Sequence, residues 1–345
     1  MPLNKDGRGK IISSICQVNC VIFDVTQAVG KVEPFWMWPS VDTEEGNIDR
    51  LRDERVVEVL RKQGKEHCFV ETWSFGQAGL AMNSKGQFVI TESKNRTVKV
   101  FDRRLRFMDH FSLPVGNVDQ VRFQVFDVAV DMIDNFFVLV KLQKLYLSIF
   151  ETVVYMFDKN GGVHHQFPVK ADQYERAVMV VNSKRKVVIT FIRYRGGNAL
   201  DVYENDGQFV RSFGEGLLSH VLDVALASDD RVIVLDSGDF FVHSYVHMFS
   251  EDGDHLSKFK LFTSKFSPTL RRGITFHHSS ERIIASYYVI RGDGYLEFFT
   301  KDGEFVRSTL IRVRDIIKFQ RGMIMTAEGH VALLSVNLGR VSVFC

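Results

Sequence analysis

The sequence is poor in cysteine and proline. Only 4 of its 345 residues are Cys and 6 are Pro. Cys16 and Cys20 are separated by three residues, but neither has the further His and Cys partners that a tetrahedral zinc site needs. The cysteines make no even disulfide framework, and the residues from Met1 to Asp6 lack the apolar core of a secretory signal. This usage predicts a reducing, cytoplasmic location.

Long apolar runs and a strong charge of one sign are also missing. No stretch approaches the roughly 18 consecutive apolar residues that predict a membrane helix, so no membrane association is expected. The formal net charge is only +2, and any binding of nucleic acid must depend on where the charges lie. There is no Gly-x-Ser-x-Gly elbow, phosphate-binding loop or His-Glu-x-x-His pair. We therefore expect no enzyme activity, no catalytic residues and no cofactor.

What the sequence does contain is a repeated apolar run that ends in Phe or Tyr. The six runs are Val98–Phe101, Val154–Phe157, Leu200–Tyr203, Val246–Phe249, Leu296–Phe299 and Val341–Phe344. Their final aromatic residues are 45 to 56 positions apart. A strand-like pattern with a period of roughly 40–50 residues is typical of a β-propeller, in which each unit is one four-stranded blade.

Further strands flank each run. An acidic or polar turn such as Asn205-Asp206-Gly207 or Lys301-Asp302-Gly303 follows four of the runs, and a fourth strand then begins. Two weaker strands precede each run, for example 177–181 with 187–190, and, in the last unit, 316–319 with 331–334. The pattern predicts an all-β fold, a six-bladed propeller over residues 66–345.

The last unit ends at Cys345, after its third strand. Residues Thr72-Trp73-Ser74-Phe75-Gly76 match Val210-Arg211-Ser212-Phe213-Gly214, which form the fourth strand of the third unit. We therefore predict that an N-terminal strand at 69–75 closes the last blade as its outer strand, which leaves no free sheet edge.

These motifs resemble the NHL-repeat propellers. The resemblance covers about residues 68–345 and rests on Asp206-Gly207-Gln208-Phe209-Val210-Arg211-Ser212-Phe213-Gly214, on Leu222–Ala225 and on Val234–Gly238. It departs from the family at the entry to the first strand, where Ala78-Gly79 and Arg272-Gly273 replace the usual Pro-x-Gly. Such propellers are often the C-terminal domain of tripartite-motif proteins, so the resemblance implies a place in a ubiquitin-ligase type of assembly.

Residues 1–65 are predicted to be a short α/β appendage or linker. Ile48, Leu51, Val56, Val59 and Leu60 fall near helical spacing, which predicts one helix at about 47–63 between an Asn47 cap and Gly64. The helix is either a docking element or the end of a coiled coil. No RING or B-box is present in the sequence, so a tripartite-motif ligase activity would lack its catalytic module here.

Histidines raise the alternative of a metal-dependent hydrolase or lyase in the central channel. His247 is expected within a third strand, His164, His165 and His255 at the blade periphery, and His277 and His278 in a turn. Metal ligands must converge at bond distances close to ~2 Å, and these positions do not converge. We therefore predict no metal site.

The connections between second and third strands, and those between blades, are expected on one face of the propeller. Basic residues outnumber acidic ones in these connections, and aromatic residues lie among them. The expected ligand-binding face comprises Lys94, Arg96, Lys141, Lys144, Arg193, Tyr194, Arg195, Arg271, Arg272, Arg291, Arg312 and Arg314. Aromatic rings among Arg and Lys suit single-stranded nucleic acid. We thus expect a non-catalytic platform that uses this face to bind single-stranded RNA or a partner protein, with a protein–protein scaffold that binds no nucleic acid as the alternative.

Overall fold

The computed structural model describes residues 79–93, 95–114, 121–144, 150–170, 176–192, 198–237, 244–261, 269–289, 294–311, 320–335 and 340–344. The chain divides into two units, Met1–Arg52 and Asp53–Cys345, and every described residue belongs to the second. The predicted appendage at 1–65, its helix at 47–63 and the predicted closing strand at 69–75 lie outside the described residues.

The described residues form antiparallel sheets whose strands follow one another in chain order, as the repeat predicts. Five sheets have four strands and are called blades 1–5 here, and a further sheet has three. Blade 1 contains β1 (Leu80–Met82), β2 (Phe88–Glu92), β3 (Thr97–Phe101) and β4 (Phe107–Ser112). Blade 2 contains β5 (Val121–Val130), β6 (Phe136–Lys144), β7 (Phe150–Phe157) and β8 (Val163–Pro168). Blade 3 contains β9 (Arg176–Val181), β10 (Val187–Ile192), β11 (Asn198–Tyr203) and β12 (Phe209–Leu218).

The chain continues around the ring in the same way. Blade 4 contains β13 (Val221–Leu226), β14 (Val232–Asp236), β15 (Tyr245–Phe249) and β16 (His255–Lys260). Blade 5 contains β17 (Thr269–His277), β18 (Arg282–Val289), β19 (Gly294–Thr300) and β20 (Phe305–Ile311). The three-stranded sheet contains β21 (Gln320–Met325), β22 (Val331–Ser335) and β23 (Arg340–Phe344).

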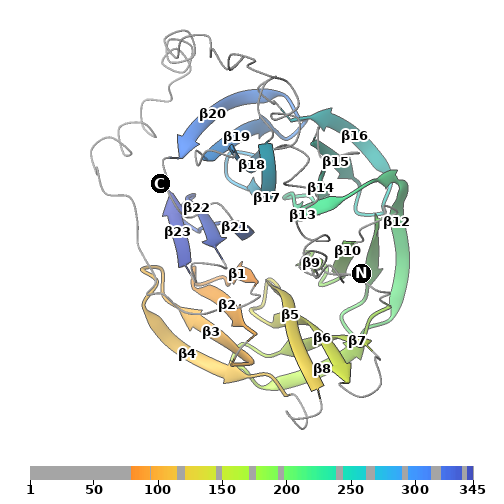
Figure 1. Cartoon of the computed structure of the whole chain (residues 1–345), viewed down its shortest axis with the longest axis vertical. Helices are drawn as coiled ribbons and strands as arrows, with labels where there is room; N and C mark the ends of the chain where they lie inside the picture. The colour runs from red at the N-terminus through yellow and green to blue at the C-terminus, as the bar shows by residue number, and fades with distance from the viewer. Residues whose placement is uncertain are drawn as a thin grey trace, which may run out of the picture. The chain divides into compact units, whose positions relative to one another are not determined.

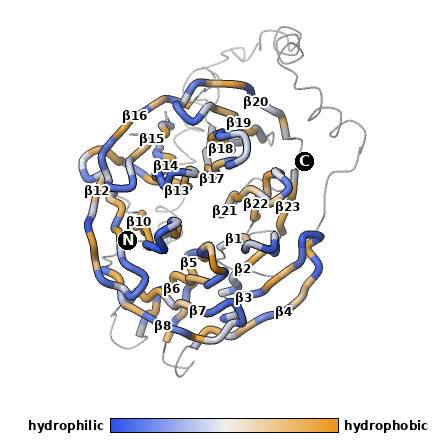
Figure 2. Tube along the Cα trace, turned by 180° about the vertical axis from the view of Figure 1, so that it is seen from behind, coloured by the Kyte–Doolittle hydropathy of each residue, from blue (hydrophilic) through white to orange (hydrophobic). Residues whose placement is uncertain are grey.

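The first strands of successive sheets contact one another around the centre, and β21 contacts both β17 and β1, so the sheets form a ring (Figure 1). Hydrophobic and hydrophilic residues are interspersed along the strands, as expected for sheets packed face to face (Figure 2). The aromatic residues that end the third strands fill the space between blades, since Phe101, Phe157, Tyr203, Phe249 and Phe299 are at most 2 % exposed.

Two faces follow from this topology. Turns that join first to second and third to fourth strands lie on one face, which we call the turn face. Connections between second and third strands, and between sheets, lie on the opposite one, which we call the loop face.

The inner strand of the last sheet, β21, begins at Gln320, later in the sequence than the strand predicted at 316–319. The predicted positions lie outside the described residues. Arg321 and Gly322 interrupt the apolar pattern of β21, while Met323 is buried between β22 and its neighbours. The turn after β21, closed by Gly329 N–H donating to the Thr326 carbonyl at 3.0 Å, fixes its register with β22.

A glycine and a phenylalanine meet at each of four outer seams between blades. Gly161, Gly207, Gly253 and Gly303 occupy the turn before the fourth strand, all with φ between +81° and +93°. Each lies against a Phe in the fourth strand of the preceding blade, in the pairs Gly161 with Phe111, Gly207 with Phe167, Gly253 with Phe213 and Gly303 with Phe259. The glycine of this turn is therefore required for two reasons: it adopts a positive φ, and it leaves room for the Phe side chain of the preceding blade.

Substitution of Gly207 by Ala should destabilise the propeller by about 2–5 kcal/mol. A β-carbon at Gly207 would lie 2.3 Å from the Phe167 β-carbon, so an overpacking cost of about 1–3 kcal/mol adds to a left-handed backbone cost of about 1–2 kcal/mol. Gly216→Ala is the matched control, because φ there is +75° but no atom lies within 4 Å of its β-carbon position. Urea unfolding should show a markedly larger loss for Gly207→Ala, and equal losses would contradict the packing role.

Candidate functional site

Blade 2 has longer strands than its neighbours at its loop-face end. β5 pairs with β6 from Val130↔Phe136 to Val121↔Lys144, and β6 continues its pairing with β7 as far as Gln143↔Phe150. This extended hairpin accounts for the longest step between successive repeats, the 56 residues from Phe101 to Phe157. The tip at 145–149 lies outside the described residues.

The extension carries a mixed set of polar and aromatic side chains. In one cross-strand row Arg122 pairs with Gln143, which pairs with Phe150, and in the next row Gln124 pairs with Lys141. Residues paired directly across strands share a face of the sheet. One surface of the sheet therefore carries two cations, two side-chain amides and an aromatic ring.

A pocket of about 420 Å³ opens at this surface. It is lined by Ser93, Arg122, Phe123, Gln124, Lys141, Gln143 and Phe150. Ser93 belongs to the β2–β3 connection of blade 1, and its hydroxyl accepts a hydrogen bond from the Val125 N–H at 3.0 Å. This bond ties the blade 1 loop to β5, so both blades contribute to the pocket.

Cations lie over both aromatic rings. The Lys141 Nζ is 4.3 Å from the centre of the Phe150 ring, and the Arg96 guanidinium carbon is 5.6 Å from the centre of the Phe123 ring. Arg96 has φ 55°, and its carbonyl accepts a hydrogen bond from the Leu113 N–H at 2.8 Å, which fixes the loop that presents it. Such contacts orient a cation without neutralising its charge.

None of the described residues that line the pocket is a carboxylate. Arg122 is exposed and makes no ion pair with any described residue, and the side-chain amides of Gln124 and Gln143 make no hydrogen bond to one. Phe150 is 39 % exposed. The site therefore offers unused donors and acceptors, positive charge and an accessible aromatic surface.

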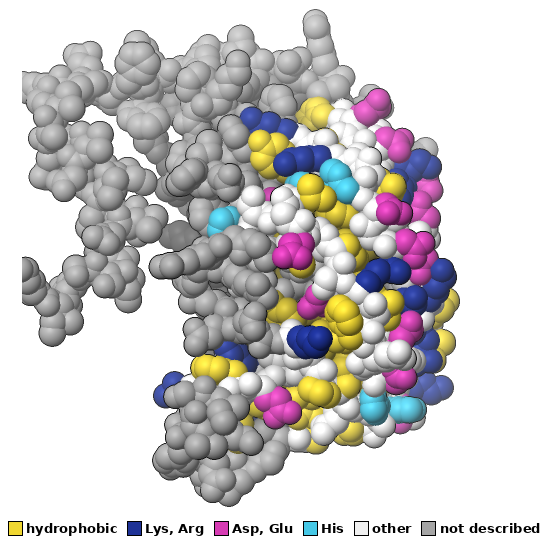
Figure 3. Space-filling view, turned by 90° about the vertical axis from the view of Figure 1, so that its right-hand side faces the viewer, with side chains coloured by type: hydrophobic (Ala, Val, Ile, Leu, Met, Phe, Trp, Pro, Cys, Tyr) yellow, Lys and Arg dark blue, Asp and Glu magenta, His cyan; other side chains and the backbone are white. Residues whose placement is uncertain are grey.

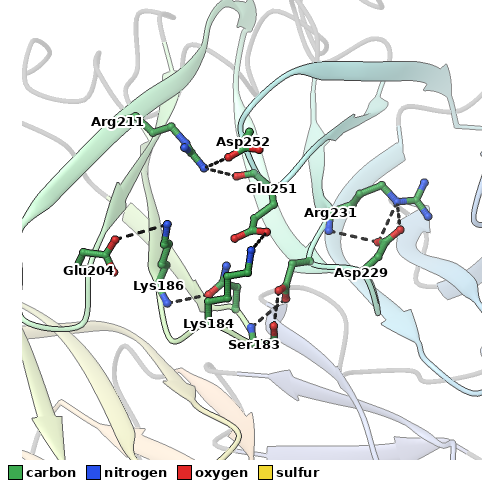
Figure 4. A network of polar contacts seen from close by, with 11 residues as sticks. Ser183, Lys184, Lys186, Glu204, Arg211, Asp229, Arg231, Glu251 and Asp252 are labelled. Carbon is green, nitrogen blue, oxygen red and sulfur yellow. Dashed lines mark hydrogen bonds and ion pairs between the residues drawn. The ribbon is translucent and has the colours of Figure 1, made fainter.

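Charges on the turn face are arranged differently. Lys184 donates to the Glu251 carboxylate at 2.6 Å, Arg211 pairs with Asp252 at 3.1 Å, and Arg231 with Asp229 at 2.8 Å (Figure 4). Figure 3 likewise shows Lys and Arg side chains interspersed with Asp and Glu along the right-hand edge of the molecule. Cations there are largely neutralised by neighbouring acids, whereas Arg122 is not.

Only part of the predicted basic face can be placed. Arg96 and Lys141 lie at the pocket. Residues Lys94, Arg193, Tyr194, Arg195, Arg291, Arg312 and Arg314 lie outside the described residues. Sequence reasoning did not single out Phe123, Gln124 and Gln143, although the alternation of positions 141 and 143 along a strand could have indicated them.

Four residues predicted in connections lie in strands instead. Lys141 and Lys144 are in β6, because the hairpin pairing continues past the expected end of the strand. Arg271 and Arg272 are in β17, where Arg271 pairs with Tyr287 and a register shift follows before Gly273. A β-bulge of this kind lengthens the inner strand, so the connection is shorter than the sequence suggests.

Two aspartates on inner strands link blades around the channel. Asp127 of β5 accepts the Met179 N–H of blade 3 at 2.9 Å, and Asp223 of β13 accepts the Ile274 N–H of blade 5 at 3.0 Å. The second oxygen of each carboxylate accepts the N–H of the next residue in its own strand. Burial raises the pKa of both carboxyl groups to about 7.

The pKa of Asp223 predicts a pH dependence of stability. An unfolded Asp titrates near ~3.9, so between about pH 4 and pH 7 the folded protein holds a proton that the unfolded chain has released. The free energy of unfolding should therefore fall as pH rises through this range, by on the order of a few kcal/mol. The side chain in Asp223→Asn cannot titrate, so the free energy of unfolding of this variant should fall less between pH 5 and pH 7.5. Urea unfolding at the two pH values measures the difference. An unchanged dependence would contradict the assignment.

His247 lies in β15 and His255 in β16, as predicted, and His278 lies in a turn. His277 was predicted in the same turn but is the last residue of β17, because its pairing with Arg282 extends the strand. His247 is 1 % exposed, its Nδ1 lies 3.2 Å from the His255 Nε2, and its Nε2 lies 4.0 Å from the Asp236 carboxylate. Burial lowers the pKa of His247 to about 4, so the imidazole is neutral near pH 7. Asp236 instead accepts the His220 N–H at 2.6 Å and holds the connection between blades 3 and 4. Among the described residues, no group of three or more His, Cys, Asp or Glu could hold a metal ion.

Comparison with solved structures supports the fold. PQQ-bound aldose sugar dehydrogenase from Streptomyces coelicolor matches over 81 % of this chain and 96 % of that chain, with TM-score 0.55 and 11 % identity. A streptogramin B lyase matches over 81 % and 96 %, with TM-score 0.53 and 10 % identity. A gluconolactonase from Xanthomonas campestris matches over 79 % and 86 %, with TM-score 0.50 and 12 % identity. At such identities the likeness shows a β-propeller and nothing about activity.

No family model and no curated protein matches the sequence. In the part of the chain that the structure describes, no helix is long and apolar enough to cross a membrane.

Proposed function

We propose that this chain is a cytoplasmic, non-catalytic binding platform that holds single-stranded RNA on its loop face. The observation that carries the proposal is the blade 2 pocket, whose described residues bring together positive charge, side-chain amides and aromatic rings without a carboxylate. In this proposal the fold is a six-bladed, NHL-like propeller, with residues 69–75 as the outer strand of the three-stranded sheet.

Electrostatics favour a polyanion at this pocket. Among the described residues, Arg122 has no ion-pair partner, and no acid lines the pocket to repel a phosphate. Cations paired with carboxylates, as on the turn face, would have to exchange one anion for another. An unpaired surface cation gains a partner on binding and releases the counterions condensed on the nucleic acid.

Aromatic surface favours a single strand over a duplex. Phe150 presents 39 % of its surface, and bases can stack on such a ring only where they are unpaired. Stacking on an aromatic side chain contributes about 1–3 kcal/mol per base. The same rings would suit a peptide, so a protein partner without nucleic acid is the competing function.

The inner strands do not favour catalysis in the channel. Asp127 and Asp223 use both carboxylate oxygens for backbone N–H groups, which leaves neither free to bind a metal or a substrate in its present hydrogen bonding. Both acids act as links between blades.

The proposal is tested by fluorescence anisotropy of the whole chain with labelled single-stranded RNA pools at two salt concentrations. We expect binding at low salt that weakens as salt rises, with log affinity falling by ~0.7 per phosphate contact for each unit of log salt. The absence of binding at low salt would refute the RNA function. Capture of a protein from nuclease-treated lysate, together with that absence, would favour the scaffold.

A further inference from the structure

We infer that the blade 2 pocket is a subsite for one nucleotide and that it prefers adenine. The inference rests on the proposed RNA function and concerns which base that same site selects. The residues that carry it are Gln143, Phe150 and Arg122, which form one row across β5, β6 and β7.

The pocket has the size of a single-nucleotide site. Its volume of about 420 Å³ is near the lower end of the ~300–1,000 Å³ that is usual for small-molecule pockets. One base with its phosphate fits such a space, whereas a tract of several bases does not. Neighbouring nucleotides of an RNA strand must therefore lie on other parts of the loop face.

In the row of Arg122, Gln143 and Phe150, a base that stacks on Phe150 lies beside the Gln143 amide, which can distinguish one base from another. Directly paired residues have β-carbons ~5 Å apart, so a base stacked on Phe150 has an edge within reach of the Gln143 amide. Arg122 lies across from Gln143 on the other side, and Lys141 lies two residues from Gln143 in β6. The two cations are thus positioned to hold a phosphate on either side of the amide.

The amide chemistry favours adenine. A Gln side chain offers one donor and one acceptor, which match the adenine N6 amino group and an adjacent ring nitrogen in a bidentate pair. The pairing edge of guanine presents two N–H donors, which call for a carboxylate, and the described pocket-lining residues include none. Uracil and cytosine can also pair with an amide, but their single rings cover less of Phe150 than a purine does.

The unbonded side-chain amide of Gln143 supports a role in base recognition over a structural role. Its side-chain amide makes no hydrogen bond within the described residues, and neither does that of Gln124, the nearest other amide in the pocket. An amide that stabilised the hairpin would be bonded to it. Both amides instead remain available to a ligand.

The test uses labelled nine-nucleotide RNAs of uridine with a central A, G, C or U, bound to the whole chain and measured by fluorescence anisotropy. We expect the central A to bind about tenfold more tightly than the central U. Gln143→Leu should abolish that preference, so that the RNAs with a central A and a central U bind with the same affinity. Gln166→Leu is the matched control, since Gln166 is an exposed amide on the outer strand β8 of the same blade, and it should keep the preference.

Outcomes separate this inference from the function on which it rests. If the RNAs bind but all four central bases bind equally, or if the preference survives Gln143→Leu, the adenine subsite is overturned and the RNA function stands. If no RNA binds, both fail. If AMP alone competes as strongly as the whole RNA, the adenine subsite is supported, and the RNA assignment is refuted in favour of a free adenine nucleotide.

Discussion

A chain that lacks residues 1–76 is expected to aggregate, whereas a chain that lacks only residues 1–60 is expected to stay soluble and to melt cooperatively. The reason is the three-stranded sheet, in which no described strand pairs with the outer edge of β23. Every other sheet has a fourth strand there. An uncovered β edge is a template for association between chains, and the predicted strand at 69–75 would cover it.

The seam between this sheet and blade 1 supports the same assignment. Phe75 matches Phe213, which covers Gly253 in the turn of the next blade. In blade 1 the equivalent turn has Leu105 in place of glycine, with φ 61° and the same turn hydrogen bond to the Asp102 carbonyl at 2.9 Å. Leu105 is 5 % exposed and packs with Val341 of β23, so this seam is built for apolar contact.

Gel filtration and a thermal melt of the two truncated chains decide the question. A soluble, cooperatively melting fragment of residues 77–345 would refute closure by the N-terminal strand. Loss of the fold on removal of 1–60 would show instead that the appendage is integral to the propeller.

Reversal of charge at the pocket should abolish RNA binding. The double variant Arg122→Glu/Lys141→Glu replaces both pocket-lining cations with acids, so it removes two phosphate contacts and repels the strand. We expect binding to fall below detection at moderate salt. The milder Arg122→Gln should bind measurably and show a salt slope shallower by ~0.7, as expected for one lost contact.

The matched control is Lys85→Glu/Lys159→Glu, an equal change of charge on exposed turn-face lysines. Binding should change little in that variant, because only the total charge differs. Equal losses in the two double variants would contradict a pocket on blade 2 and leave a nonspecific effect of net charge. Melting temperatures of both variants should be compared first, since Lys141 also packs on Phe150.

The repeat was predictable from the sequence because the residues that recur in it are buried ones. Each apolar run that ends in Phe or Tyr is the third strand of a sheet, from Phe101 in β3 to Phe344 in β23, and burial between blades demands such residues at each period. Strand β21 begins at Gln320, later than the strand expected at 316–319. Its described side chains are only partly buried except for Met323, and Arg321 interrupts the apolar pattern from which a strand is recognised.

The site was harder to predict because it depends on where strands end. Spacing placed Lys141 in a loop, whereas cross-strand pairing with Gln124 and Thr152 keeps it in a sheet. The pairing of Arg122 with Gln143 does not follow from composition, because it depends on how the two strands align. The sequence could suggest basic residues for this face, but it could not indicate which of them line a pocket.

The hydrogen bonds and ion pairs between neighbouring blades determine where the ring could be opened without loss of a specific contact. Ser84 of blade 1 donates both its hydroxyl and its backbone N–H to the Asp134 carboxylate of blade 2, and Ser183 of blade 3 donates the same two groups to Asp230 of blade 4. The acids of β5 and β13 bind instead to backbone N–H groups of the following blade, which any sequence supplies. Side-chain pairs also join blades 2 and 3, in the ion pair of Arg185 with Asp131, and blades 4 and 5, in the hydrogen bond of Ser228 with His278. Each seam from blade 1 to blade 5 therefore carries at least one specific side-chain pair, and circular permutation or exchange of blades at any of these seams would have to break it.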